Sequence, residues 1–224
     1  MPIARVIAAC LGLLCAAACE PWGKPGPEPA PALKVTDFKT LFSENCSGCH
    51  GVDGKKGPGR ILNDPLYLAV IPKDALQHVI EQGRPGTAMP PWVLSQGGPL
   101  TSEQITALVN GIEQNWAKAV SLPRATPSYT SGGLAGDDAR GKKLFLRDCF
   151  ACHFKGGIAG PVTDPNYLAL VSDQNLRTSI IVGRPDLGMP DYRILNAGHA
   201  LNDQDVADLV TYLASLRPAN GAKQ

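Results

Sequence analysis

Two short stretches of this chain, residues 46–50 and 149–153, carry the side chains with the clearest chemistry. The first reads Cys-Ser-Gly-Cys-His and the second reads Cys-Phe-Ala-Cys-His, so both have the pattern Cys-x-x-Cys-His. This pattern is typical of c-type haem attachment. If each stretch is helical, its cysteines and histidine project from one face. The two thiols can then form thioethers with the vinyl groups of a macrocycle, while the imidazole reaches its iron from one side.

Other chemistry is open to Cys-x-x-Cys pairs. One pair could be a thiol redox couple, and two pairs could form a four-cysteine zinc site. Zinc pairs are usually separated by about 15 to 20 residues, whereas these copies start 103 residues apart and each is followed by histidine. We therefore predict two covalently bound haem c groups, one at Cys46, Cys49 and His50 and one at Cys149, Cys152 and His153.

The two motifs belong to a longer internal repeat. Residues 64–90 align with residues 164–190, and twelve of these 27 positions are identical. Duplication explains this identity better than chance, and a repeat of this length predicts two similar domains. We name residues 35–119 the first repeat and residues 137–217 the second repeat. The predicted linker between them is 120–136, and 218–224 is a C-terminal tail.

Each repeat is predicted to be mostly helical. Apolar spacing predicts an amphipathic helix before each motif, a middle helix that ends at a Gly-Arg-Pro sequence, and a final helix. Thr101 and Asn202 are suitable N-caps for the final helices. The expected helices span 37–45, 74–82 and 102–119 in the first repeat and 138–148, 173–182 and 203–216 in the second.

The order of helix, Cys-x-x-Cys-His, loop, helix, Met-Pro loop and helix resembles the class I cytochrome c family in tandem. The resemblance implies an all-α fold, with two tandem cytochrome c domains that each form a small helical fold around one haem. It also implies that Met89 and Met189, each followed by proline at equivalent positions, are the second axial ligands of the two irons. With His50 and His153 opposite them, both irons would be six-coordinate and suited to single-electron transfer.

The resemblance and the repeat suggest further candidates. Family members place a backbone carbonyl at the positions of Pro58 and Pro161 against the proximal imidazole, where a plain turn proline is the alternative. The tyrosines are expected to pack in the core, with a haem-propionate contact as the alternative. For the arginines, core packing and a propionate contact are equally open. The aromatic residues after each methionine are expected to cover the haem edge. These candidates are Tyr67, Tyr167, Arg84, Arg184, Trp92 and Tyr192; His78 and His199 break the repeat and are expected to be ordinary surface histidines.

The N-terminus resembles an export signal. Residues 1–18 hold one charged residue, Arg5, and an apolar run that is too short to span a bilayer. The small residues before Cys19 resemble a bacterial lipoprotein box, so Cys19 is predicted to be lipidated, with simple cleavage or a retained leader as alternatives. Residues 19–34 would form a proline-rich tether from the anchor.

Charge gives little guidance to partners, because 21 basic and 20 acidic residues leave a net charge of +1. No nucleic-acid footprint is visible. The sequence predicts a di-haem cytochrome that carries single electrons between redox partners on the periplasmic side of a bacterial membrane and is not itself an enzyme. One alternative is a fixed subunit of a quinol-oxidising, terminal oxidase or dehydrogenase complex. A di-haem peroxidase is a further alternative, although it would need an open or openable iron.

Overall fold

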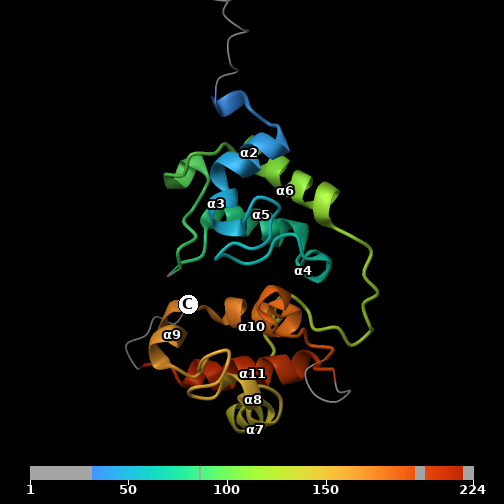
Figure 1. Cartoon of the computed structure of the whole chain (residues 1–224), viewed down its shortest axis with the longest axis vertical. Helices are drawn as coiled ribbons and strands as arrows, with labels where there is room; N and C mark the ends of the chain where they lie inside the picture. Colours follow the sequence, from blue (N-terminus) through green and yellow to red (C-terminus); the bar gives the residue numbers. More distant parts are fainter. Residues whose placement is uncertain (1–31, 86, 195–199, 219–224) are drawn as a thin grey trace, which may run out of the picture. The chain divides into compact units, whose positions relative to one another are not determined.

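The computed structural model describes residues 32–85, 87–194 and 200–218 (Figure 1). The chain divides into residues 1–34 and residues 35–224, and the first unit is described only in the 3-10 helix η1, Ala32–Lys34. Within the described residues there is no β-strand, only two isolated bridges. The predicted all-α class is confirmed. None of the described helices is long and apolar enough to cross a membrane.

The two repeats have the same order of elements. In each, a first helix leads into a single helical turn at the motif, and three further α-helices follow. The first repeat contains α2 Phe38–Asn45, α3 Ser47–His50, α4 Pro65–Val70, α5 Lys73–Gln82, η2 Leu94–Gln96 and α6 Ser102–Trp116. The second contains α7 Asp138–Asp148, α8 Phe150–His153, α9 Pro165–Leu170, α10 Asp173–Val182, η3 Pro185–Leu187 and α11 Asp203–Ser215.

The first and last helices of the first repeat pack against each other. Helix α2 lies against α6, which also contacts α4 and α5 (Figure 1). Phe42 of α2 meets Trp116 of α6 edge to face, with ring centroids 4.9 Å apart. The close approach needs Gly111, because a Cβ there would lie 2.2 Å from the ring of Phe38. The apolar stripes of α2 and α6 therefore pack directly against each other.

The second repeat uses the same pairing, with α7 against α11 and α10 against α11 (Figure 1). Charged groups reinforce it, because Arg140 of α7 forms ion pairs with Asp205 and Asp208 of α11. Asp208 also accepts a hydrogen bond of 2.8 Å from the amide of Asp137. Burial acts to raise the pKa of Asp208, but the Asp137 amide, Gln204 and Arg140 outweigh it and hold the pKa below its usual value.

Most predicted helix bounds agree with the structure. The predictions for 138–148 and 173–182 match α7 and α10, and the capping boxes at Thr101 and Asn202 are present. The prediction for 102–119 was too long, because α6 ends at Trp116 and extended backbone begins at Ala117. The join between the repeats contains no helix or strand over residues 117–136.

Helices α4 and α9 were not predicted. Each is six residues long, and each has an aspartate N-cap followed by proline at the first helical position. Asp64 accepts a hydrogen bond from the amide of Leu66 at 2.9 Å, and Asp164 accepts one from the amide of Asn166 at 2.8 Å. The Asp-Pro pair is a recognised helix start. That signal was present in both copies of the sequence.

Candidate haem sites

Each Cys-x-x-Cys-His motif begins where the preceding helix ends. Cys46 closes α2 and serves as the N-cap of α3, with φ −117° and ψ −33°. Its carbonyl accepts hydrogen bonds from the amides of Cys49 at 3.2 Å and His50 at 3.0 Å. One helical turn therefore carries the two thiols and the imidazole, as the spacing predicted.

The second motif repeats this backbone closely. The Cys149 carbonyl accepts from the amides of Cys152 at 3.2 Å and His153 at 3.0 Å. The first cysteine of each motif is half-buried and the second is exposed. The two attachment turns are therefore alike, although their flanking loops differ in sequence.

The first thiol of each motif is poorly suited to the thiolate chemistry of a zinc site or of a redox couple. Burial, and then the neighbouring Cys49, raise the pKa of the Cys46 thiol to about 12. Burial, followed by Asp148, raises the pKa of the Cys149 thiol to about 12 as well. Both of those chemistries need a thiolate. No group of three or more His, Cys, Asp or Glu side chains is placed to hold a metal ion in the part of the chain that the structure describes.

The proximal imidazoles are oriented by backbone carbonyls, but not by those of Pro58 and Pro161. His50 Nδ1 lies 2.7 Å from the carbonyl oxygen of Arg60, and His153 Nδ1 lies 3.1 Å from that of Gly160. Of the two alternatives for these prolines, the carbonyl contact is contradicted, because the loop places a neighbouring carbonyl at each ring. Such a contact fixes the orientation of a metal-binding histidine and leaves Nε2 for the iron.

Met89 and Met189 lie in loops of similar geometry. Arg84 N–H donates to the Met89 carbonyl at 2.9 Å, and Arg184 N–H donates to the Met189 carbonyl at 3.0 Å. The turn depends on Gly83, whose φ of 68° and ψ of −159° suit glycine almost alone. These contacts position both methionines at equivalent places in the repeats.

A large cavity brings the predicted residues together. Its volume is about 1570 Å³, whereas a pocket for one small ligand or cofactor is about 300–1,000 Å³. It is lined mainly by apolar side chains. Among its lining residues are all eight predicted haem-site residues, namely Cys46, Cys49, His50, Met89, Cys149, Cys152, His153 and Met189. The size, the apolar lining and the ligand set fit two haem groups.

The other candidates divide between the cavity and the core. Tyr67 lines the cavity and is only 2% exposed, whereas Tyr167 lines it with 42% exposure. Trp92 also lines the cavity. Tyr192 does not, because it is fully buried and its hydroxyl lies 2.6 Å from Thr126 Oγ1 in the join between the repeats. The expectation that Tyr192 covers a haem edge was therefore wrong.

The two candidate arginines differ in their partners. Both Arg84 and Arg184 line the cavity, but Arg184 donates to Asp186 through Nε at 2.9 Å and Nη2 at 2.7 Å. The sequence position equivalent to Asp186 in the first repeat is glycine. Arg84 forms no ion pair with any carboxylate that the structure describes. The positive charge of Arg84 is thus available to a carboxylate in the cavity.

Of the two unmatched histidines, His78 alone lies in the part of the chain that the structure describes. His78 is exposed on α5, as expected of a surface histidine. His199 and the predicted lipidation residue Cys19 lie outside the described residues. The residue that sequence reasoning missed is Arg60, which touches His50 through its backbone and lines the cavity. Its signal was absent from the repeat, because Arg60 lies between Pro58 and Asp64, in a stretch where the second copy is three residues shorter.

Comparison with known proteins places these features in a family. The family described as cytochrome c oxidase, cbb3-type, subunit III, matches the chain twice, over residues 34–110 and 136–213. Cbb3-type cytochrome c oxidase subunit CcoP of Azospirillum sp. (strain B510) is 27% identical over 201 residues, which are 80% of this chain and 60% of the relative. Subunit FixP of Bradyrhizobium diazoefficiens is 30% identical over 132 residues, covering 56% of this chain and 41% of FixP.

A relative from a different complex is also similar. The cytochrome bc1 complex cytochrome c subunit of Mycobacterium bovis is 24% identical over 199 residues, which are 83% of this chain and 68% of the relative. The chain spans about two fifths to three fifths of the oxidase subunits that it matches. The two family matches, the repeated attachment motifs and the helical fold agree: this chain is a tandem c-type cytochrome with two covalent haem c groups, and it belongs to the family of cbb3-type cytochrome c oxidase subunit III.

Proposed function

We propose that this chain transfers single electrons through two His/Met-ligated haems, one in each repeat. The observation that carries the proposal is the cavity, because both motif histidines and both loop methionines line it. Haem supplies an iron that changes its charge by one when it is oxidised or reduced. Cys46 and Cys49 would hold the first macrocycle and Cys149 and Cys152 the second.

The surrounding residues would keep each iron closed and oriented. The carbonyls of Arg60 and Gly160 fix the ring planes of His50 and His153. The hydrogen-bonded loops would hold Met89 and Met189 against the opposite side of each iron. A thioether opposite imidazole favours the reduced iron relative to two imidazoles. An iron closed in this way changes its ligands little on reduction, which suits electron transfer better than substrate chemistry.

We assign this function to repeats that span residues 35–119 and 137–217, joined by residues 120–136. Because each repeat contributes both a histidine and a methionine to the cavity, we propose a carrier and not an enzyme such as a peroxidase. Binding of carbon monoxide to the reduced holoprotein tests this directly. Six-coordinate sites should not bind it, and rapid binding at either iron would favour a peroxidase.

The partners that we propose are the redox proteins of respiratory membranes. Support comes from relatives named as subunits of a cbb3-type oxidase and of a bc1 complex. Those names favour a role as an electron-transfer subunit over a freely diffusing carrier. Mild detergent extraction followed by size-exclusion chromatography distinguishes the two. A subunit should elute with a larger haem-containing complex, whereas a carrier should elute alone.

We further propose export to the periplasmic side of a bacterial membrane, with a lipid on Cys19 and residues 19–34 as a tether. Haem attachment outside the cytoplasmic membrane, implied by the family resemblance, supports export. The small residues before Cys19 support lipidation. Cys19→Ser should move the haem protein from the membrane fraction to the soluble periplasmic fraction. Persistence in the membrane would indicate a retained leader or anchoring by a partner.

A further inference from the structure

Arg60 occupies a position where the two repeats share a backbone role but not a side chain. The Arg60 carbonyl contacts His50, whereas the carbonyl that contacts His153 belongs to Gly160, which aligns with Gly57. The residue whose carbonyl orients the imidazole is therefore an arginine in the first repeat and a glycine in the second. The contact with His50 uses only the backbone carbonyl of Arg60. The Arg60 side chain can therefore make other contacts.

The Arg60 side chain reaches the other repeat. Its Nη2 donates to Ser179 Oγ on α10 at 2.6 Å, and the aligned residue in the first repeat, Val79, offers no such acceptor. The guanidinium carbon also lies 5.7 Å from the ring centroid of Tyr67, within the range of a cation–π contact. The inter-repeat contact thus joins Arg60, which lies where the second copy is shorter, to Ser179, at which the aligned copies differ.

The charge of Arg60 is not balanced by protein carboxylates. It forms no ion pair among the residues that the structure describes. Burial lowers the pKa of Arg60 and repulsion from Arg84 and Arg184 lowers it further, whereas Tyr67 and Asp64 act to raise it. A half-buried cation beside two other cations is costly unless an anion is bound nearby.

The cavity supplies the place for that anion. Arg60, Arg84 and Arg184 all line it, together with both attachment motifs. Haem carries two propionate carboxylates, and guanidinium groups bind carboxylates through two parallel hydrogen bonds. Arg184 is already paired with Asp186, so Arg60 and Arg84 are the two uncompensated cations available to the first haem.

We propose that Arg60 binds a propionate of the first haem and, through Ser179, couples that haem to the second repeat. This inference rests on the proposed function, because it requires haem in the first repeat. Arg60 is then a positioning residue at the junction of the two repeats. Its positive charge favours the reduced state of the first iron, and its contact with α10 steadies the loop that orients His50.

The test replaces Arg60 in the holoprotein and measures both potentials by spectroelectrochemistry. Arg60→Gln should lower the ferrous-to-ferric ratio of the first haem at a fixed potential by roughly three- to tenfold, where tenfold corresponds to 59 mV for one electron. The second haem should shift less. Arg60→Lys, which keeps the charge, should restore most of the potential. The wave that moves in Met89→Ala identifies the first haem.

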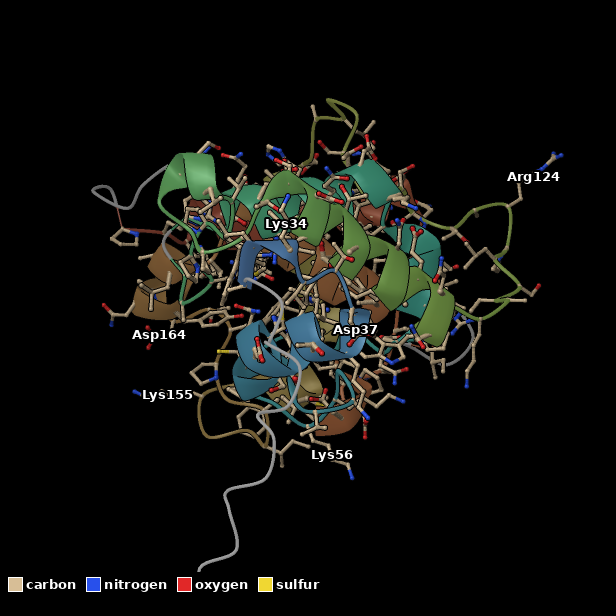
Figure 2. The ribbon with its side chains drawn as sticks, turned by 90° about the horizontal axis from the view of Figure 1, so that it is seen from above. Lys34, Asp37, Lys56, Arg124, Lys155 and Asp164 are labelled. Carbon is tan, nitrogen blue, oxygen red and sulfur yellow. The ribbon has the colours of Figure 1, made fainter. Side chains whose placement is uncertain are left out.

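The matched control is Arg124→Gln, which removes the same charge from an exposed side chain in the join (Figure 2). It should leave both potentials unchanged. An unchanged first-haem potential in Arg60→Gln, with haem content intact, would overturn the propionate contact. If the wild-type protein contains no covalent haem, the proposed function itself fails, and haem staining of a denaturing gel distinguishes the two failures.

Coupling to the second repeat is tested with Ser179→Val, which installs the side chain of the first repeat. Hydrogen–deuterium exchange should increase over residues 57–63 in Ser179→Val and in Arg60→Gln, but not in Arg124→Gln. Equal exchange in all three variants would refute the coupling. Since Ser179→Val keeps the charge of Arg60, its first-haem potential should move by less than half the shift seen in Arg60→Gln.

Discussion

Gly83 offers the sharpest perturbation of the first axial-ligand loop. It follows α5, with φ 68° and ψ −159°, in a region that is essentially restricted to glycine. A Cβ at this position would lie 2.4 Å from the Pro90 carbonyl carbon and 2.5 Å from the Met89 carbonyl oxygen. Both are backbone atoms, so no side-chain rotation can relieve the overlap.

Gly83→Ala should therefore displace the backbone that carries Met89. The conformational strain alone costs about 1–3 kcal/mol, and the overlap adds to it. For a unit of 150–250 residues, this strain corresponds to a melting temperature lower by about 2–12 °C. Because the displaced atoms belong to the ligand itself, the charge-transfer band between methionine sulfur and ferric iron should weaken at one haem and persist at the other.

The assay pairs thermal unfolding with the optical spectrum of the oxidised holoprotein. Gly97→Ala is the matched control, because Gly97 also has a positive φ of 83° but a Cβ added there would meet no atom within 4 Å. It should cost about 1–2 kcal/mol and leave the band intact. A Gly83→Ala protein with unchanged stability and an unchanged band would refute the proposed geometry of the loop.

Three further predictions concern the ligands, the join and acid stability. Met89→Ala and Met189→Ala should each keep both haems attached but convert one iron to a high-spin or substituted site, seen by electronic absorption; an unaltered spectrum would reject that methionine as a ligand. Arg177 is 3% exposed and donates to the Ser128 carbonyl at 3.0 Å. Arg177→Met should therefore reduce the free energy of unfolding in urea by about 1–3 kcal/mol. The control Lys73→Ala, which changes an exposed side chain, should reduce it by only about 0–1 kcal/mol. The pKa of Asp208 is lower in the folded protein than in the unfolded chain, so its contribution to stability is present above about pH 4 and is lost as pH falls through the folded pKa. Asp208→Asn should flatten this loss of stability at acid pH. A curve of stability against pH that runs parallel to that of the wild type would count against the Arg140 network.

The sequence predicted the helices whose periodicity and caps are local. Helix α10 and the capping box at Thr101 were identified because their signals lie within one or two turns. Helix α4 was missed because six residues hold too little periodicity, although its Asp-Pro start could have indicated it. Local patterns thus predict longer helices more reliably than helices of one or two turns.

In the candidate site, too, residues marked by a sequence pattern were predicted, whereas contacts that depend on loop geometry or on distant residues were not. The attachment motifs and the methionines were found because the two copies align, and all of them line the cavity. The carbonyl that contacts His50 belongs to Arg60, two residues beyond the candidate Pro58, because loop geometry decides which carbonyl meets the ring. The Arg60 side chain could not be found from the repeat, because its role depends on a contact with Ser179 that lies 119 residues away in the chain.

The most direct test of the central claim is a spectroelectrochemical titration of the purified holoprotein, with carbon monoxide added to the fully reduced sample. Two one-electron steps, low-spin spectra in both oxidation states and no carbon monoxide binding are expected for two closed His/Met haems. A single step with one haem per chain, or carbon monoxide binding at either iron, would contradict the assignment of a pair of closed electron-transfer centres.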